Sequence, residues 1–98
     1  MSRITIVVTL EAKEGEFENL LEISRVQARR SMDEEPGCLN FEVLRPKEKT
    51  ACLIFVEHYA DQAALDHHVG TERLAAFREA MLPLVSSREL TFCDVEEV

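Results

Sequence analysis

The chain has 98 residues, of which 46% are hydrophobic, and a formal net charge of −8 from 19 acidic residues against 11 Lys and Arg residues. A chain of this length is expected to form a single domain, residues 1–98, with a modest core. Its acidic balance argues against nucleic acid and against an anionic membrane surface as partners, because both attract basic proteins.

Neither a secretory signal nor a membrane span is expected from the sequence. The first residues enter an alternating segment without a charged region followed by an apolar one, and no apolar run approaches the roughly 20 residues that a spanning helix needs. Three cysteines without a close pair fit neither a disulfide framework nor a zinc site; they are Cys38, Cys52 and Cys93. We therefore expect a cytoplasmic protein with reduced thiols.

The first predicted elements are a strand and an amphipathic helix. A strict alternation predicts a half-buried strand whose apolar side is Ile4, Ile6, Val8 and Leu10. After a turn at Gly15, apolar and small residues recur at helical spacing, at Phe17, Leu20, Leu21, Ser24, Ala28 and Met32. Pro36-Gly37 is expected to end that helix.

The middle of the chain predicts a hairpin. A second strand runs from Cys38 to Val43, and a polar loop over residues 45–49 leads to a third strand from Ala51 to Tyr59. The third strand is apolar on both faces until Glu57, which is typical of a central strand.

The last third predicts two short helical pieces and a strand. The first piece spans Ala63 to Val69 and breaks at Gly70; Thr71 caps the second, and Pro83 disturbs its last turn. A fourth strand is expected from Leu90 to Val95. The order β-α-β-β-α-β predicts an α+β ferredoxin-like fold with a four-stranded antiparallel sheet and both helices on one face.

The face of the sheet away from the helices is expected to join two copies of the chain. Residues assigned to it, such as Phe55, Val7 and Leu44, are too apolar to lie open to water, and large exposed apolar patches mark interfaces. We therefore expect a barrel-like homodimer whose polar side chains line an internal cavity.

Side-chain alternation assigns the polar residues of the hairpin to that cavity. If Leu39, Phe41 and Val43 point toward the helices, the alternate residues of the second strand point toward the cavity; these are Cys38, Asn40 and Glu42. If Ile54 and Val56 meet the helices, the third strand presents to it Phe55, Glu57 and Tyr59. The hairpin loop does not fix this register.

Each candidate site residue has a structural alternative. Glu57 either lies at the rim, solvated or paired with Arg73 or Arg78, or orients His68, since a catalytic imidazole needs its second nitrogen held. Asn40 either makes an edge hydrogen bond or contacts substrate, and Tyr59 either packs in the core with its hydroxyl toward solvent or contacts substrate. His67 and His68 are adjacent on a helix and point apart, so they do not indicate a metal site.

Three segments carry a resemblance to a known family over nearly the whole chain. They are Glu35-Pro36-Gly37-Cys38-Leu39-Asn40-Phe41-Glu42-Val43, Glu57-x-Tyr59-x-Asp61 and Ala64-Leu65-x-x-His68-x-x-Thr71. In these spacings the chain resembles the antibiotic biosynthesis monooxygenase family. The resemblance implies a dimeric α+β barrel and oxygenation of aromatic anthrones or quinols without flavin, haem or metal, although one related branch isomerises a phosphorylated metabolite and another degrades haem.

The resemblance also implies roles for individual residues. His68 matches the family histidine, Glu57 and Tyr59 match the Glu-x-Tyr element, and Asn40 falls where many members carry a polar residue near the ligand. Many members continue Pro-His-Phe after the threonine, whereas here Arg73 replaces the second histidine, which suggests an anionic or strongly polar ligand.

The hypothesis from the sequence is therefore a site for a small molecule and dioxygen. His68 is proposed to be either the base or a donor that stabilises the substrate anion, oriented by Glu57. The remaining candidate residues are expected to contact or stabilise the substrate, namely Asn40, Phe55, Tyr59 and Arg73. Two alternatives use the same residues: an isomerase of a small carbonyl metabolite, and a dimeric barrel that binds a small ligand without catalysis.

Overall fold

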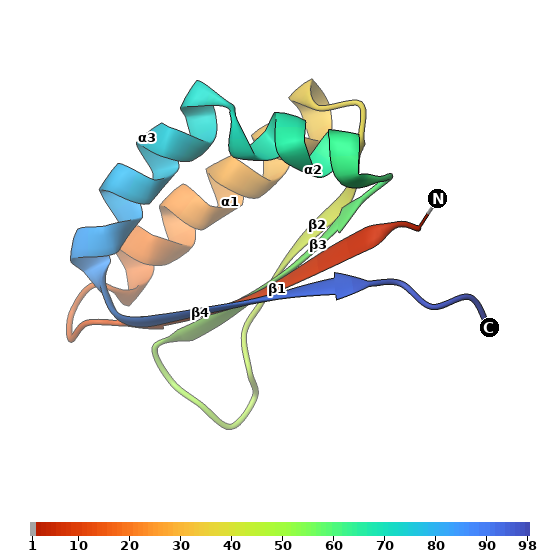
Figure 1. Ribbon diagram of the computed structural model, residues 1–98. Coiled ribbons are helices and arrows are strands. Elements are labelled where there is room, and N and C mark those ends of the chain that lie inside the picture. Colours follow the sequence, from red (N-terminus) through yellow and green to blue (C-terminus); the bar gives the residue numbers. More distant parts are fainter. Residues whose placement is uncertain (1) are drawn as a thin grey trace.

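The predicted strands form one antiparallel sheet with the order β2-β3-β1-β4 in the computed structural model, which describes residues 2–98. The elements are, in chain order, β1 (Ile4–Ala12), α1 (Phe17–Glu34), β2 (Cys38–Leu44), β3 (Cys52–Tyr59), α2 (Gln62–Val69), α3 (Glu72–Met81), the short 3₁₀ helix η1 (Leu82–Leu84) and β4 (Val85–Asp94). The helices lie on one face of the sheet (Figure 1). This arrangement confirms the α+β ferredoxin-like fold and the central position of the third strand.

Side-chain caps mark the start of α2 and the start of α3. The Asp61 carboxylate accepts a hydrogen bond from the backbone N–H of Ala64 at 2.9 Å, and the Thr71 hydroxyl accepts one from Leu74 at 3.2 Å. Each cap satisfies a backbone donor that the first turn of a helix leaves unpaired. The two predicted helical pieces are confirmed, and α2 holds His68 in its last turn.

The last strand begins at Val85, earlier than the Leu90 start expected from the sequence. Pro83 ends the helical segment through η1, and the chain then pairs at once with β1, from Val85 opposite Ala12. The polar stretch from Ser86 to Glu89 hides this strand from an apolar pattern, because β4 is an edge strand and these residues are exposed.

The expected assignment of β2 side chains to the two faces of the sheet is partly wrong, because a β-bulge interrupts the alternation. Cys38 pairs with Tyr59, and the next pair is Asn40 with His58, so Leu39 is the extra residue. Cys38 therefore lies in the core on the helix side, and Leu39 is 50% exposed. Phe41 and Val43 face the helices as expected, since both belong to or pack against the same core.

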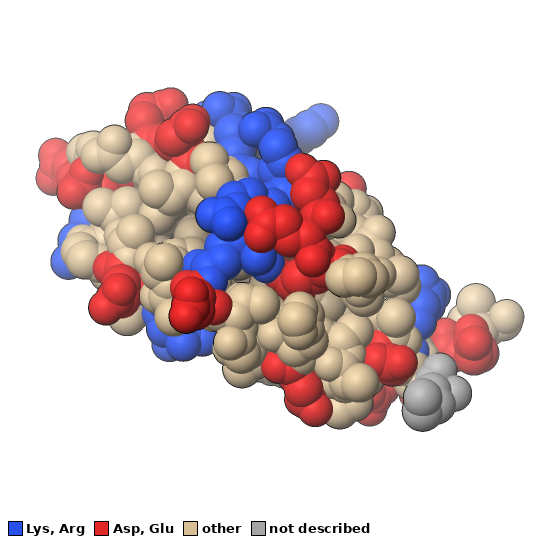
Figure 2. All heavy atoms as spheres, turned by 90° about the horizontal axis from the view of Figure 1, so that it is seen from above, with Lys and Arg blue, Asp and Glu red and all other residues tan. Residues whose placement is uncertain are grey.

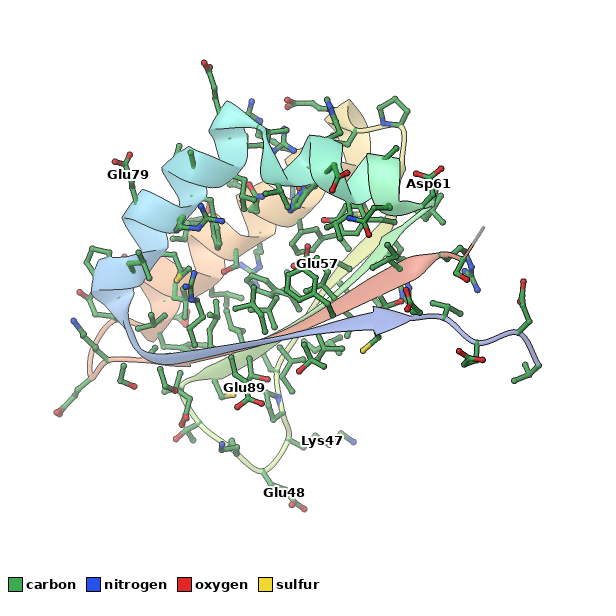
Figure 3. All side chains as sticks on the ribbon, viewed as in Figure 1. Lys47, Glu48, Glu57, Asp61, Glu79 and Glu89 are labelled. Carbon is green, nitrogen blue, oxygen red and sulfur yellow. The ribbon has the colours of Figure 1, made fainter. Side chains whose placement is uncertain are left out.

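The faces expected for β3 are reversed. Phe55, Glu57 and Tyr59 are buried on the helix side, because β1 pairs them with Val8, Ile6 and Ile4, the apolar side of that strand. Figure 3 shows Glu57 between the sheet and the helices, with Glu89 on the other side of the sheet. The residues around Glu57 therefore face a cavity within one chain, and the expected placement on the open face is wrong.

The face of the sheet away from the helices carries the alternate side chains of the strands. Val7 pairs with Val56, and Leu44 pairs with Ile54, on the side away from the helices. Homodimer formation through this face stays a prediction.

Candidate functional site

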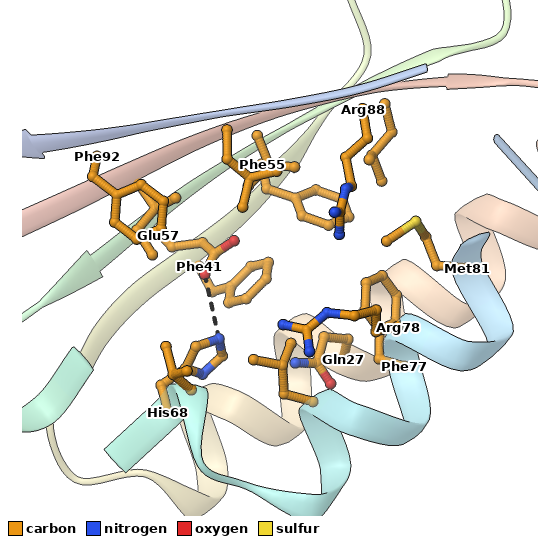
Figure 4. A pocket seen from close by; sticks show the side chains of 16 residues that line it. Gln27, Phe41, Phe55, Glu57, His68, Phe77, Arg78, Met81, Arg88 and Phe92 are labelled. Atoms are coloured by element: carbon orange, nitrogen blue, oxygen red, sulfur yellow. Dashed lines mark ion pairs between the residues drawn. The ribbon is translucent and has the colours of Figure 1, made fainter. Parts of the chain in front are cut away.

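A cavity of about 180 Å³ lies between the sheet and the helices (Figure 4). Its walls are mainly apolar, and four phenylalanines contribute rings to them: Phe41, Phe55, Phe77 and Phe92. The Phe55 ring packs against Phe41 and Phe77 with ring centroids 5.5 and 6.1 Å apart, tilted pairings that are favourable for aromatic rings. The polar side chains that reach the cavity are Gln27, Glu57, His68, Arg78 and Arg88.

His68 is held between two buried carboxylates. Its Nδ1 lies 3.0 and 3.1 Å from the two carboxylate oxygens of Glu35, and its Nε2 lies 3.6 Å from Oε1 of Glu57. The three residues are 3%, 2% and 5% exposed, respectively. The imidazole therefore has a fixed orientation, with Nε2 toward Glu57 and the cavity.

Glu35 reaches His68 because the chain turns sharply after α1. A Cβ atom at Gly37 would overlap with the Cβ of Ala64 and lie 3.3 Å from its Cα, so only glycine lets the start of β2 approach α2 this closely. The turn brings two residues that are 33 positions apart in the sequence into hydrogen-bond contact.

The charge of Glu35 is balanced from behind by Arg73. One guanidinium nitrogen of Arg73 contacts Oε2 of Glu35, and another lies 3.3 Å from Oε1 of Glu34. Glu34 also pairs with Arg30 at 2.7 Å, and Figure 2 shows acidic and basic atoms side by side over the helices. Arg73 thus stabilises a buried carboxylate and does not line the cavity, contrary to its expected contact with substrate.

Glu57 is a buried acid, and within residues 2–98 neither the solvated rim position nor a pairing with Arg73 or Arg78 is found. The Tyr59 hydroxyl donates a hydrogen bond of 2.7 Å to Oε1 of Glu57. Burial raises the pKa of Glu57 to about 7, and the Tyr59 hydrogen bond acts in the opposite direction. Glu57 therefore exchanges a proton near neutral pH. Burial and the neighbouring Glu57 raise the pKa of Tyr59, so its hydroxyl stays a donor.

His68 is neutral at pH 7. Burial lowers its pKa to about 4, and the positive charges of His67 and Arg78 act in the same direction. The Nδ1 atom of this imidazole lies 3.0 Å from the Glu35 carboxylate, which Arg73 contacts from its other side. A neutral imidazole beside that carboxylate donates Nδ1–H to it, which leaves the lone pair of Nε2 facing Glu57 and the cavity.

The structure brings together only part of the set expected from the sequence. His68, Glu57 and Phe55 line the cavity, and Tyr59 lies behind Glu57 as its hydrogen-bond donor. Asn40 is exposed beyond the β2 bulge and does not line it. Its expected contact with substrate is not found in this cavity.

Sequence reasoning did not assign to the site four residues that complete it, namely Gln27, Glu35, Phe41 and Arg88, and it considered Arg78 only as an ion-pair partner of Glu57. The available signal for Glu35 is its place in the family segment Glu35–Val43, directly before the helix-ending Pro36-Gly37. Phe41 was assigned to the helix side, where the cavity lies. Nothing in the local pattern marks Gln27 or Arg88 as site residues.

Two further properties concern the described part of the chain. Within residues 2–98, no group of three or more His, Cys, Asp or Glu side chains is placed to hold a metal ion. Across the same residues, no helix is both long and apolar enough to cross a membrane.

Comparisons with known proteins agree with this architecture. A crystal structure from Caulobacter crescentus, named as a candidate antibiotic biosynthesis monooxygenase, is 28% identical with a TM-score of 0.92, over 98% of this chain and 92% of that one. A protein from Shewanella oneidensis is 25% identical with a TM-score of 0.88, over 96% and 91%. A protein from Pseudomonas aeruginosa shares the fold at 23% identity with a TM-score of 0.89, over 99% and 97%.

Among proteins with curated descriptions, none matches this chain. The family model described as antibiotic biosynthesis monooxygenase matches residues 3–80, the segment that contains β1, α1, the hairpin, α2 and most of α3. The chain therefore belongs to the antibiotic biosynthesis monooxygenase family.

Proposed function

We propose that the protein is a cofactor-independent monooxygenase that oxidises an electron-rich aromatic molecule, of the quinol or anthrone type, with dioxygen. The observation that carries this proposal is the buried pair of His68 and Glu57, 3.6 Å apart, at the wall of a cavity built largely from aromatic and aliphatic side chains. Membership of the family supports the same reaction class.

The first step is removal of a proton from the substrate. His68 is neutral with its Nε2 lone pair exposed to the cavity, and Glu57 has a pKa of about 7, so the pair accepts one proton at neutral pH. Glu35 holds the other ring nitrogen, and Tyr59 holds the Glu57 carboxylate. Both orienting contacts come from buried groups, which keeps the base in place without loss of entropy during the reaction.

The second step is reaction of the substrate anion with dioxygen. Ground-state dioxygen is a triplet and reacts slowly with closed-shell molecules, but an electron-rich anion can transfer one electron to it and then recombine as a hydroperoxide. Loss of water leaves a new carbonyl group, so one oxygen atom enters the product, the other leaves as water, and the substrate supplies both electrons. The apolar walls exclude bulk water from this sequence.

The size of the cavity favours a small quinol over a three-ring anthrone. Its volume of about 180 Å³ lies below the roughly 300–1,000 Å³ of sites for drug-sized ligands. A one- or two-ring hydroquinone is therefore the first substrate to test.

Oxygen uptake with a panel of quinols and anthrones tests the proposal. Uptake above the autoxidation rate is expected for the wild-type protein, with a loss of about 100-fold or more in His68→Gln and Glu57→Gln, since general bases contribute about 10²–10⁴-fold. His58→Gln is the matched control, because this histidine lies on the other face of β3, where it hydrogen-bonds to Thr5, and does not line the cavity.

The same assay separates the alternatives. Full uptake by His68→Gln would contradict the assigned base. Conversion of a carbonyl substrate under anaerobic conditions would identify an isomerase, and binding without turnover of any substrate would identify a ligand-binding protein; either result would overturn the proposal.

A further inference from the structure

Two arginines reach the cavity from opposite walls. Arg78 belongs to α3 and Arg88 to β4, and both line the cavity that contains His68 and Glu57. Figure 4 shows both guanidinium groups directed into that space, with His68 and Glu57 at one end of it. Among residues 2–98, neither guanidinium has an ion-pair partner within 4.0 Å.

This arrangement is unusual for an acidic chain. The protein has 19 Asp and Glu residues against 11 Lys and Arg residues, so carboxylates are plentiful as partners. Instead, the cavity holds two cations beside a neutral His68 and a Glu57 that is protonated below about pH 7. Both arginines are exposed, so they lie where the cavity opens to solvent, and an anion that enters the cavity there gains from both guanidinium groups.

A buried amide at the same place provides an independent observation. Gln27 on α1 is 3% exposed and lines the cavity, and in the described part of the chain neither its Nε2 nor its Oε1 has a hydrogen-bond partner. Figure 4 shows it beside Arg78. An unsatisfied buried amide is costly, and a ligand that carries oxygen atoms would satisfy it.

We propose that Arg78, Arg88 and Gln27 form a subsite for a carboxylate on the aromatic substrate. The guanidinium groups bind the carboxylate oxygens, and the Gln27 amide donates to an oxygen of the same ligand. The inference rests on the proposed function for the aromatic core and names the substrate class as a one- or two-ring hydroquinone that bears a carboxylate. The anionic ligand suggested by the sequence then binds these arginines instead of Arg73.

The binding of two inert probes tests this subsite without any oxidation. 2-Naphthoate and its uncharged amide, 2-naphthamide, have nearly the same shape, and neither carries an oxidisable hydroxyl group. Titration calorimetry at pH 6 compares them, because naphthoate is ionised there while Glu57 is mostly protonated. We expect naphthoate to bind about tenfold more tightly than naphthamide.

Variants assign this preference to the cavity arginines. Arg78→Gln and Arg88→Gln should each reduce the preference about threefold or more, and the double variant should remove it. Arg29→Gln is the matched control, since Arg29 is exposed on α1 and does not line the cavity; it should keep the wild-type ratio of the two dissociation constants.

Three results would overturn the subsite: equal binding of the two probes, no binding of either up to their solubility limits, or a preference that survives in the double variant. Naphthoate preference without oxygen uptake from any quinol would contradict the oxygenase and leave the subsite standing. Oxygen uptake without a preference for naphthoate would contradict the subsite and leave the oxygenase standing. The two proposals can therefore fail separately.

Discussion

At the His68 end of the cavity, the ionisable side chains are partnered within the chain, whereas at the Arg78 end two cations in the described residues face the cavity without an ion-pair partner. Glu35 lies between His68 and Arg73, and Glu57 accepts the Tyr59 hydrogen bond. Arg78 and Arg88 are exposed at the cavity mouth, beside an unsatisfied Gln27. The first end is organised before any ligand arrives, and the second is completed by the ligand.

The largest expected effect on stability comes from removing the Glu35 carboxylate at the His68 end of the cavity. Glu35→Gln keeps the side-chain size but leaves Arg73, whose side chain is 10% exposed, without its buried anion. We expect the free energy of unfolding to fall by about 3 kcal/mol or more, because breaking a buried ion pair leaves an uncompensated charge. Urea denaturation measures this difference.

Glu34→Gln is the control for that variant. It removes the adjacent carboxylate, which is 46% exposed and pairs with both Arg30 and Arg73, and pairs that involve an exposed carboxylate contribute about 1 kcal/mol or less. Equal losses in the two variants would mean that the His68 end is not specially dependent on buried charge balance.

The second prediction concerns pH, because Glu57 and His68 affect stability in opposite directions. Glu57 has a pKa raised to about 7, so the folded state binds its proton more tightly, and the stability that this gives below pH 4.5 is lost as pH rises toward 7. His68 has a pKa lowered to about 4, so it costs stability at low pH, and stability rises from pH 4 to 6.5. In the wild-type protein the two effects largely cancel between pH 4.5 and 6.5.

Glu57→Gln separates these two effects. The variant should resemble the wild-type protein in stability near pH 4.5 and become more stable by about 3 kcal/mol above pH 7, because the amide cannot ionise. Unfolding in urea at a series of pH values measures the difference. A difference that stays constant with pH would show that Glu57 does not have a raised pKa.

The third prediction tests the turn that places Glu35 beside His68. Gly37→Ala should lower the free energy of unfolding by about 2 kcal/mol, because its Cβ overlaps with Ala64. The double variant Gly37→Ala/Ala64→Gly provides the space from the other side and should recover most of this loss. A single variant that is as stable as the wild-type protein would show that α2 can move away from β2 at little cost.

These contacts also explain which features the sequence could predict. The alternation from Ile4 to Leu10 predicts β1 and its faces, and the spacing of the family segments predicts that His68 and Glu57 belong to one site. The sequence could not predict which face of β3 meets the helices, because both faces are apolar. Only the pairing of Phe55 with Val8 of β1 shows which face this is. In β2 the bulge at Leu39 changes the parity between Cys38 and Phe41, and a single unpaired residue has no pattern of its own.

The site residues that were missed share a dependence on long-range packing. Glu35 meets His68 across 33 positions. The observed role of Arg73 depends on the same packing, because Arg73 contacts the buried Glu35 carboxylate. The sequence assigned Arg73 to the substrate on its position in the motif alone. Arg78 and Arg88 come from a helix and an edge strand that meet only in the folded chain.

The smallest expected effect belongs to the second end of the cavity and completes the comparison. Arg78→Gln and Arg88→Gln should each change the free energy of unfolding by no more than about 0.5 kcal/mol, because exposed side chains without ion-pair partners contribute little to stability. In 2 mM naphthoate the wild-type protein should gain more thermal stability than either variant, since only a bound ligand couples these arginines to folding. Thermal unfolding with and without the probe measures both quantities. A large loss of stability in the ligand-free variants would mean that these arginines stabilise the fold. The proposed difference between the His68 end, whose charges are paired within the chain, and the Arg78 end, whose charges are paired by a ligand, would then be wrong.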